Sequence, residues 1–250
     1  MQATSHTGQR LDRLDALRGV AMAWMTLFHF SFDLNHFGFI QQDFYRDPLW
    51  TWQRTLIVSL FLLCAGAGQA VAVLQGQSWA RFWRRWAQVA GCALLVSVGS
   101  WLMFPKSFIY FGVLHGIAAM LIVVRLTAHW GRWLWLLGGL AIASKFIASY
   151  ALNIWASADF VHQMNGMGWN WLGWITRKPI TEDYVPVFPW LGVMWWGAAA
   201  APLLARWLRG QAGGRGVKAL AGLGRWSLGY YMVHQPVLIA LVGALSLLRA

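Results

Sequence analysis

The stretch LRGVAMAWMTLFHFSFDL (residues 17–34) is mostly apolar, as a helix inside a lipid bilayer has to be. It nevertheless carries Arg18 near its start, and it places His29 and Asp33 one helical turn apart. Ionisable side chains at the bilayer centre cost roughly 2.5–3.5 kcal/mol each on insertion scales. A membrane helix that keeps them therefore marks a candidate functional site.

The composition of the whole chain also indicates a membrane protein. Of its 250 residues, 58% are hydrophobic and 11% are charged, whereas about 25% are charged in a typical soluble domain. The 19 Trp fit this class, because Trp concentrates at membrane–water interfaces. The formal charge of +12 comes from basic residues between the apolar runs, so it indicates topology and no nucleic-acid partner. The sequence contains no CxxC or HExxH motif, and we expect no metal site.

Apolar runs close to 20 residues recur along the chain, and about 20 residues are needed to cross a bilayer. The predicted fold class is therefore all-α: a polytopic integral membrane protein of about seven transmembrane helices. No repeat or linker interrupts the pattern, which predicts a single transmembrane domain over residues 1–250. The predicted spans are 17–39, 55–75, 87–104, 108–125, 133–152, 186–207 and 226–248.

The distribution of Lys and Arg predicts a cytoplasmic N-terminus and a C-terminus on the outside. In this orientation most of the basic residues lie in cytoplasmic segments. Those on the inside are Arg10, Arg13, Arg18, Arg81, Arg84, Arg85, Arg125, Arg132, Arg206, Arg209, Arg215, Lys218 and Arg225. Those on the outside are Arg46, Arg54, Lys106, Arg177, Lys178 and Arg249.

The outside segment 153–183 is too polar to span a bilayer, yet it is rich in tryptophan. Loops of this length are usually functional or disordered, and the tryptophans argue against disorder. We expect an interfacial helix or a lid. The sequence DYVPVFPWLG (183–192) follows, and its prolines either start a helix or shape a rigid rim that presents Asp183 and Trp190 to a substrate.

Three ionisable residues share one face of the first predicted span: His29, Asp33 at i+4 and His36 at i+7. His29 lies about 16 Å along the helix from Arg18, at 1.5 Å per residue, which is just past the membrane midplane. Histidines also lie in the middle third of two other predicted spans, at His115 and His234. These residues form the candidate polar site of the membrane interior.

A histidine at this depth can act as a general base, because it titrates near neutrality and accepts a proton from an attacking hydroxyl or amine. A carboxylate one turn away can fix the histidine tautomer and stabilise the imidazolium. One alternative is packing, in which the polar side chains hydrogen-bond neighbouring helices. Others are a transporter, with a proton or substrate path along the same residues, and a noncatalytic scaffold.

Four motifs in order resemble the heparan-α-glucosaminide N-acetyltransferase catalytic-domain family in its short bacterial branch. They are RLDALRGVAMAWMTLFHFSFDLNHFGF (13–39), FIYFGVLHGIA (108–118), DYVPVFPWLG (183–192) and GRWSLGYYMVHQPVL (224–238). The spacing of Arg18 and His29, with ten residues between them, is similar to a pattern of the acyltransferase-three family. Members of that family O-acetylate surface polysaccharides.

The resemblances imply a membrane acyltransferase that moves an acetyl group from cytoplasmic acetyl-CoA to a hydroxyl or amine of an envelope saccharide. His29 matches the catalytic histidine of the acyltransferase-three pattern, whereas the histidine regarded as catalytic in the animal N-acetyltransferase lies nearer His36. We favour His29 because its depth suits a thioester that enters from the cytoplasm, and His36 stays open as the alternative. Asp33, His115 and His234 complete the candidate catalytic set.

The phosphates of acetyl-CoA need cations, and the cytoplasmic rim offers Arg18, Arg84, Arg85 and Arg225. The expected partners are the lipid bilayer and a saccharide or glycolipid acceptor, and an oligomer is compatible with the sequence. We expect a multi-pass protein located in a bacterial inner (plasma) membrane. The main alternative is a proton-coupled small-molecule transporter that uses the intramembrane His/Asp cluster; inverted repeats would favour it, and the sequence shows none.

Overall fold

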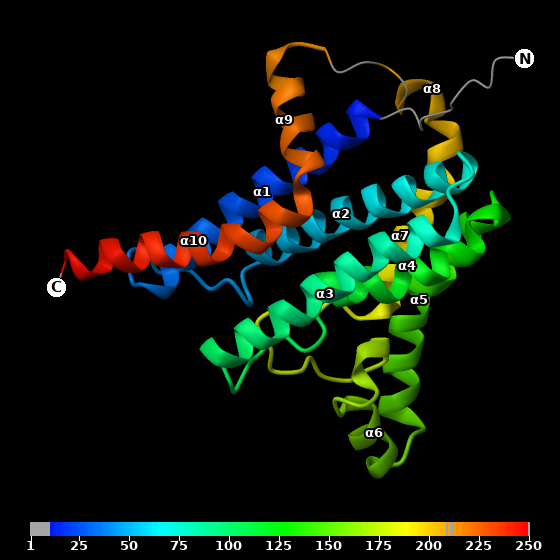
Figure 1. Cartoon of the computed structure of the whole chain (residues 1–250). Coiled ribbons are helices and arrows are strands. Elements are labelled where there is room, and N and C mark those ends of the chain that lie inside the picture. The colour runs from blue at the N-terminus through cyan, green and yellow to red at the C-terminus, as the bar shows by residue number, and fades with distance from the viewer. Residues whose placement is uncertain (1–10, 209, 211–212, 250) are drawn as a thin grey trace, which may run out of the picture. The chain divides into compact units, whose positions relative to one another are not determined.

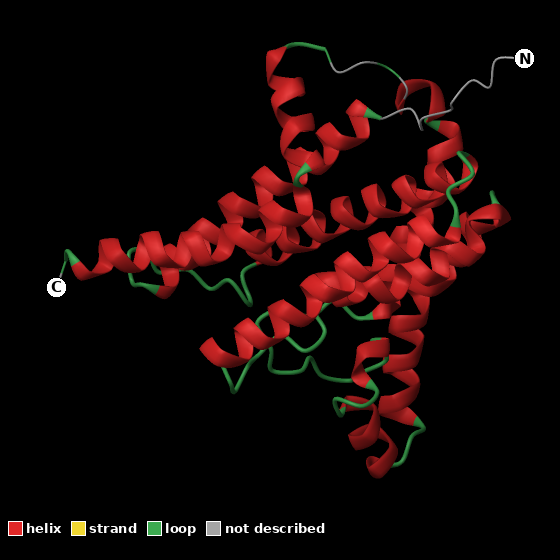
Figure 2. Ribbon diagram, viewed as in Figure 1, coloured by secondary structure: helices red, strands yellow, loops and turns green. Residues whose placement is uncertain are grey.

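The structure is a computed structural model that describes residues 11–208, 210 and 213–249. Helices dominate these residues, and the ribbon in Figure 2 contains no strand over them. An isolated bridge pairs Phe111 with Tyr184. The predicted all-α class is therefore confirmed. Of the basic residues used to predict the topology, Arg10 and Arg209 lie outside the described residues.

The chain forms two compact units, which are described separately here. The terminal unit comprises Met1–Phe61 and Leu204–Ala250, and the central unit comprises Leu62–Leu203. Helix α2 (Pro48–Leu74) continues through the division. That residues 1–250 form a single domain stays a prediction.

In the terminal unit, helix α1 packs along helices α9 and α10 (Figure 1). Glycines allow the backbones to approach closely, because a Cβ at Gly19 would overlap the backbone of Leu220 and one at Gly224 would overlap that of Asp15. A second face of α1 packs its apolar side chains against the first half of α2. The helices other than α2 are α1 (Asp12–His36), α8 (Ala205–Leu208), α9 (Arg215–Arg225) and α10 (Ser227–Leu247).

In the central unit, helix α7 packs against α4 and most extensively against α5. Gly138 of α5 and Gly192 of α7 face each other where these two helices cross, so neither position has room for a Cβ. Small residues at such crossings are typical of helix pairs in membranes. The elements are α3 (Trp79–Met103), α4 (Val113–Thr127), η1 (Ala128–Trp130), α5 (Trp133–Ile154), α6 (Ala158–Asn165), η2 (Asn170–Leu172) and α7 (Val187–Leu203).

Five helices among the described residues are long and apolar enough to cross a membrane: α2, α3, α4 with η1, α5 and α10. Their outer faces carry large apolar side chains, for example Leu102 of α3 at 70% exposure and Phe146 of α5 at 65%. Such faces suit contact with lipid chains. The chain is therefore a multi-pass membrane protein.

The predicted count of seven spans is not confirmed, although all seven predicted segments fall on helices. Polar side chains in the second half of α1 reduce its hydropathy, and α7 has only 17 residues. The side of the membrane on which the N-terminus lies likewise stays a prediction.

Several predicted boundaries were wrong, each for a local reason. Helix α2 begins earlier than residue 55, at Pro48, which suits the first turn of a helix because it needs no N–H donor there. Helix α4 begins only at Val113, because the preceding residues pair with the loop before α7. Helix α1 ends at His36, before Gly38, whose φ of 76° leaves the helical region.

The α5–α7 crossing predicts a contrast between two adjacent glycines. Gly138→Ala should lower the free energy of unfolding by about 1–3 kcal/mol, because the new Cβ would meet Trp196 and the backbone of Gly192. Gly139→Ala is the matched control, since a Cβ there meets no atom within 4 Å. The measurement is the Tm of each variant in detergent, and equal Tm values would contradict this packing.

Candidate active site

A chain of hydrogen bonds in the terminal unit joins His29 and Asp33 of α1 through Gln235 of α10. The Gln235 side-chain Nε2 donates to Asp33 Oδ1 at 2.9 Å. The Gln235 Oε1 in turn hydrogen-bonds Nδ1 of His29. His29 and Asp33 lie on one face of α1, as predicted, but the neutral amide stands between them instead of a direct bond.

This arrangement fixes the tautomer of His29. An amide carbonyl oxygen can only accept a hydrogen bond, so Nδ1 of His29 has to be the donor. In the neutral ring the other nitrogen, Nε2, then carries the lone pair. Gln235 cannot turn over without placing its carbonyl oxygen against the Asp33 carboxylate. Asp33 therefore orients the amide, and the amide orients the His29 ring with its lone pair on Nε2.

His234, next to Gln235 in α10, contributes a second imidazole to the same region. Its ring centroid lies 5.2 Å from that of His29. Its Nδ1 is 2.7 Å from the backbone carbonyl of Tyr231, to which it has to donate. The Tyr230 ring stacks on His234 at 5.8 Å, and its hydroxyl donates to Thr26 of α1, whose own proton goes to a backbone carbonyl. His29, Asp33 and His234 are thus brought together, as the sequence predicts.

Two polar atoms of this network are buried without a hydrogen-bond partner among the described residues: Oδ2 of Asp33 and Nε2 of His234. Asp33 is only 3% exposed and His234 only 6%. Buried polar atoms are normally paired. The network therefore keeps one acceptor of each residue available for a bound group.

His36 lies at the C-terminal end of α1 and is exposed. Its ring packs edge-on against Phe37 at 5.1 Å. It is one turn beyond Asp33, in reach of solvent, whereas His29 is held inside the network. The geometry favours His29 over His36 as the base, and the choice stays a prediction.

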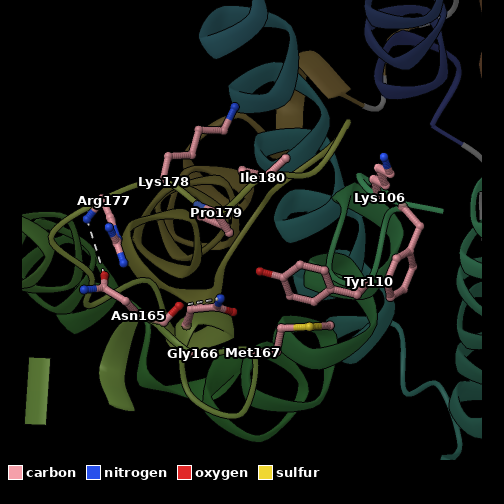
Figure 3. Close-up of a pocket in the computed structure, with 11 residues that line it drawn as sticks. Lys106, Tyr110, Asn165, Gly166, Met167, Arg177, Lys178, Pro179 and Ile180 are labelled. Atoms are coloured by element: carbon pink, nitrogen blue, oxygen red, sulfur yellow. Dashed lines mark hydrogen bonds between the residues drawn. The ribbon is translucent and has the colours of Figure 1, made fainter. Parts of the chain in front are cut away.

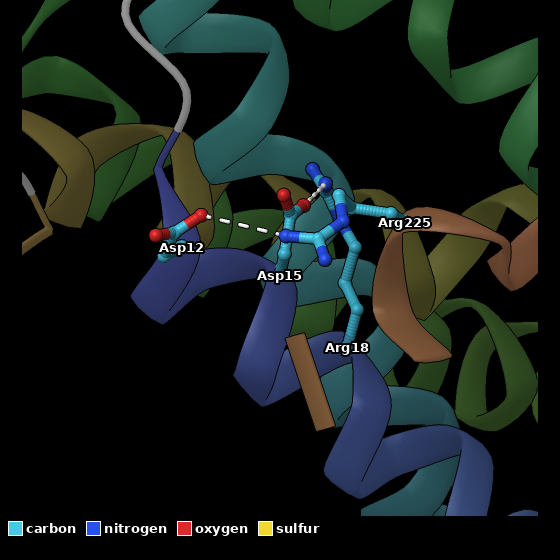
Figure 4. Close-up of polar contacts among 4 residues, drawn as sticks. All are labelled: Asp12, Asp15, Arg18 and Arg225. Carbon is cyan, nitrogen blue, oxygen red and sulfur yellow. Dashed lines mark hydrogen bonds and ion pairs between the residues drawn. The ribbon is translucent and has the colours of Figure 1, made fainter. Parts of the chain in front are cut away.

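The predicted phosphate ligands fall into both units. In the terminal unit Arg18 pairs with Asp15 at 2.7 Å, and Arg225 pairs with Asp12 at 3.6 Å (Figure 4). In the central unit Arg84 and Arg85 lie on the exposed first turns of α3. The two arginines of the terminal unit form one cluster at the start of α1. Acidic partners already balance part of its charge.

In the central unit His115 caps its own helix. Its Nδ1 accepts the backbone N–H of Gly112 at 3.3 Å, and its Nε2 lies 3.0 Å from Ser97 Oγ. Ser97 gives its proton to the carbonyl of Ile109, so Nε2 of His115 is the donor. Both ring nitrogens are engaged in holding the start of α4. This geometry favours a structural role for His115 over the predicted catalytic one.

Asp183 also caps α4, from the loop before α7. Its Oδ2 accepts the backbone N–H of Val113 at 2.7 Å, and the approach requires Gly112, where a Cβ would overlap that oxygen. Trp190 lies in the first turn of α7, partly buried. The geometry of Asp183 is that of a helix cap for α4. The substrate contacts predicted for Asp183 and Trp190 stay predictions.

The long loop after α5 is ordered by polar contacts and an aromatic stack. Trp174 stacks on Phe188 at 4.8 Å, and Tyr184 donates to the backbone carbonyl of Asn170 at 2.5 Å. Burial raises the pKa of Tyr184 and of Tyr110, although the Asn170 side chain lowers that of Tyr110 in part. Both hydroxyls therefore keep their protons at neutral pH. The segment contains the short helix α6, and its position at the membrane interface stays a prediction.

Two residues of these sites were missed by reasoning on the sequence. Gln235 lies in the motif YYMVHQPVL, inside a predicted span. A neutral amide costs less to place in a membrane than a charged side chain does, so it did not stand out as a candidate. Asn170 is one of several polar residues in its loop, and its burial to 1% exposure is visible only in the structure. The signal available for Gln235 was its position beside His234.

The fold defines a multi-pass helical membrane protein, and its terminal unit holds a hydrogen-bonded network of His29, Gln235 and Asp33. The family model described as heparan-alpha-glucosaminide N-acetyltransferase, catalytic, matches residues 10–236. The chain belongs to this family, and the resemblance predicted from its motifs is confirmed. The match ends just after Gln235, so it includes the whole hydrogen-bond chain to Asp33. No curated protein and no solved structure gives a significant match.

The cap at α4 predicts a graded loss of stability. Asp183→Ala should lower the free energy of unfolding by about 0.5–2 kcal/mol, because the N–H of Val113 loses its acceptor. Asp183→Asn should cost less, since an amide oxygen can still accept. Thermal unfolding in detergent measures both. An Asp183→Ala variant as stable as the native chain would rule out the cap.

Proposed function

We propose that the chain transfers an acetyl group from cytoplasmic acetyl-CoA to an amine or hydroxyl of an envelope saccharide or glycolipid, in a bacterial inner membrane. Membership of the N-acetyltransferase family supports the reaction class. The observation that carries the proposal is the Gln235 bridge, which holds His29 with its Nε2 lone pair available. This is the form of imidazole that a general base requires.

In the proposed reaction Nε2 of His29 takes a proton from the acceptor amine or hydroxyl as that atom attacks the thioester carbonyl carbon. The new C–N or C–O bond forms and the C–S bond breaks. The proton then passes from His29 to the departing sulfur, which leaves as free CoA thiol. Asp33 and Gln235 are positioning residues, because they act through the orientation of the ring.

His234 is proposed to hold a reacting group beside His29. Its Nε2 is buried and has no partner among the described residues. With Nδ1 donating to the carbonyl of Tyr231, Nε2 can only accept, for example from an acceptor hydroxyl or amine. The pair of imidazoles would then share the proton-bearing atom of the acceptor.

A proton-coupled transporter is the runner-up, and the family match does not favour it. The two functions differ in one binding property. An acetyltransferase binds acetyl-CoA, so its Tm rises with ligand concentration. In the proposal Arg18 and Arg225 of the terminal unit and Arg84 and Arg85 of the central unit are the candidate phosphate ligands.

The base is tested by His29→Gln in the purified protein. The variant should lose transfer by about 10²–10⁴-fold, the usual effect of losing a positioned base, and should keep its Tm and its stabilisation by acetyl-CoA. Release of CoA thiol with glucosamine as acceptor measures the rate. His36→Gln is the matched control and should lose much less. Loss of turnover in His36→Gln, with His29→Gln active, would transfer the role to His36.

The positioning role is tested by Gln235→Met, which keeps the length of the side chain and removes its polar atoms. We expect kcat to fall by roughly tenfold or more, with an unchanged KM for acetyl-CoA, because the ring loses its fixed tautomer. Asp33→Asn should have a smaller effect, since its amide oxygen still accepts from Gln235. If Gln235→Met loses stability but retains kcat, the bridge is only interhelical packing.

The donor site is tested by Arg18→Ala. We expect acetyl-CoA to bind about tenfold more weakly or worse, near 1.4 kcal/mol, because charge-assisted contacts to phosphate are lost. Arg13→Ala is a control on the same helix, since Arg13 donates to the backbone of Trp207. Unchanged affinity in a folded Arg18→Ala variant would remove Arg18 from the donor site.

A further inference from the structure

A pocket of about 520 Å³ lies in the central unit, between the α3–α4 loop and the long loop after α5 (Figure 3). Three cationic residues line it: Lys106, Arg177 and Lys178. Its described lining includes no acidic residue. The carboxylate of Glu182, close by along the chain, instead accepts the hydroxyl of Ser107 at 2.5 Å. The pocket therefore has a positive potential that favours an anionic group.

The pocket lies at one end of two helices that can cross a membrane. Lys106 follows the end of α3 at Met103, and α4 begins a short loop later at Val113. Both helices are long and apolar enough for a membrane span. A short loop between two spans has to lie at the edge of the hydrocarbon region, at the level of the lipid headgroups. Cationic side chains at this level attract the phosphates of anionic lipids.

Exposed apolar side chains adjoin the cationic lining of the pocket. Ile180 and Met167 both line it and are 84% and 57% exposed. Leu102 and Met103, on the last turn of α3 before Lys106, are 70% and 53% exposed. A soluble anion would leave these side chains in contact with water, whereas the acyl chains of a lipid would cover them. The surroundings of the pocket therefore suit an amphipathic ligand.

Asn170 brings a buried acceptor to the wall of this pocket. The residue is 1% exposed, and its Nδ2 donates to the backbone carbonyl of Asn165 at 3.2 Å. This bond fixes the amide, so Oδ1 cannot exchange places with Nδ2. Oδ1 has no hydrogen-bond partner among the described residues. Because a carbonyl oxygen only accepts, its missing partner has to be an N–H or O–H group.

Tyr110 adds a hydroxyl to the same pocket, and Figure 3 shows it directed into the space. This oxygen also lacks a hydrogen-bond partner within the part of the chain that the structure describes. Asn170 lies near it, because its side chain lowers the pKa of Tyr110 in part, against the effect of burial. One hydroxyl group of a ligand can accept from Tyr110 and donate to Asn170. An ammonium group only donates and an ionised phosphate oxygen only accepts, so neither can do both.

The walls of the pocket are fixed before any ligand binds. Asn165 Oδ1 accepts the backbone N–H groups of Thr176 and Arg177, at 3.1 and 3.4 Å, and its Nδ2 donates to Thr176 Oγ1 at 2.9 Å. The other wall is tied across by Thr181, which donates to the carbonyl of Phe108 at 2.8 Å. A preorganised site loses less entropy when it binds.

We infer that this pocket binds the headgroup of an anionic phospholipid that carries hydroxyl groups, of the phosphatidylglycerol type. The phosphodiester lies near Lys106 and Arg177, and a headgroup hydroxyl joins Tyr110 to Asn170. The acyl chains lie along the exposed apolar side chains at the end of α3. The lipid stabilises the central unit, because it contacts both loops at once. This inference concerns the central unit alone and does not depend on the proposed acetyl transfer.

Other membrane lipids meet fewer of these demands. Phosphatidylcholine offers no donor to Asn170, and its ammonium group is repelled by the three cations. Phosphatidylethanolamine has N–H donors, but its ammonium group is repelled in the same way and cannot accept from Tyr110. Phosphatidylmethanol is the most informative comparison, because its phosphodiester has the charge of phosphatidylglycerol and its headgroup has no hydroxyl.

The test measures lipid binding to the full chain in detergent by native mass spectrometry, with these four lipids as probes. Phosphatidylglycerol should bind at least about tenfold more tightly than phosphatidylcholine or phosphatidylethanolamine, since each Lys or Arg near the phosphate contributes about fivefold. It should bind severalfold more tightly than phosphatidylmethanol and should raise the Tm as its concentration rises. Equal affinities for phosphatidylglycerol and phosphatidylcholine, or for phosphatidylglycerol and phosphatidylmethanol, would overturn the inference.

Variants assign the binding to this pocket. Lys106→Gln and Arg177→Gln should each weaken phosphatidylglycerol binding by about fivefold. Tyr110→Phe should remove the preference for phosphatidylglycerol over phosphatidylmethanol and leave the Tm of the lipid-free protein unchanged. Arg132→Gln is the control, because this exposed arginine lies at the start of α5, at the opposite end of that helix from the long loop. Unchanged affinity in all three pocket variants would contradict the assignment.

A last comparison separates a lipid from a free phosphate ester. Glycerophosphoglycerol is the headgroup of phosphatidylglycerol without its acyl chains, and inorganic phosphate is the simplest soluble anion. Neither should displace phosphatidylglycerol at equal concentration, because the apolar contacts at the end of α3 require acyl chains. Displacement by either at equal concentration would identify a site for soluble phosphates and would overturn the assignment to a lipid.

Discussion

The terminal unit depends on one neutral side chain, the amide of Gln235. A buried carboxylate and a half-buried imidazole on the same helix each need a partner of defined polarity. The amide supplies a donor to Asp33 and an acceptor to His29 from a residue about 200 positions away in the chain. The packing of α10 on α1 and the protonation pattern of His29 are therefore set by the same contact. The proposed site of proton transfer is thus built from contacts that also hold α1 and α10 together.

The central unit uses its polar residues in a different way. His115 and Asp183 were both candidates for chemistry, and both satisfy backbone N–H groups at the start of α4. The first N–H groups of a helix have no partner inside the helix, and leaving them unpaired near a membrane is costly. These caps join the α3–α4 loop to the loop before α7.

Much of the fold could be predicted from the sequence, because apolar runs and the length needed to cross a bilayer depend on local composition. The shared face of His29 and Asp33 follows from helical periodicity alone, and the structure retains it. The bridging role of Gln235 could not be predicted, because it depends on which helices pack together. The start of α4 was missed for a similar reason, since its cap comes from Asp183, far along the chain. Periodicity shows which residues share a helix face and leaves the partner across the interface unknown.

The central claim is that Gln235 holds His29 as the Nδ1–H tautomer, with the lone pair on Nε2. Nitrogen-15 NMR of histidine-labelled protein tests it most directly, with the His29 signals assigned by their loss in His29→Gln. The account predicts a protonated Nδ1 and an unprotonated Nε2 in the native chain, and a mixture of tautomers in Gln235→Met. A His29 that is protonated at Nε2 in the native chain would contradict it.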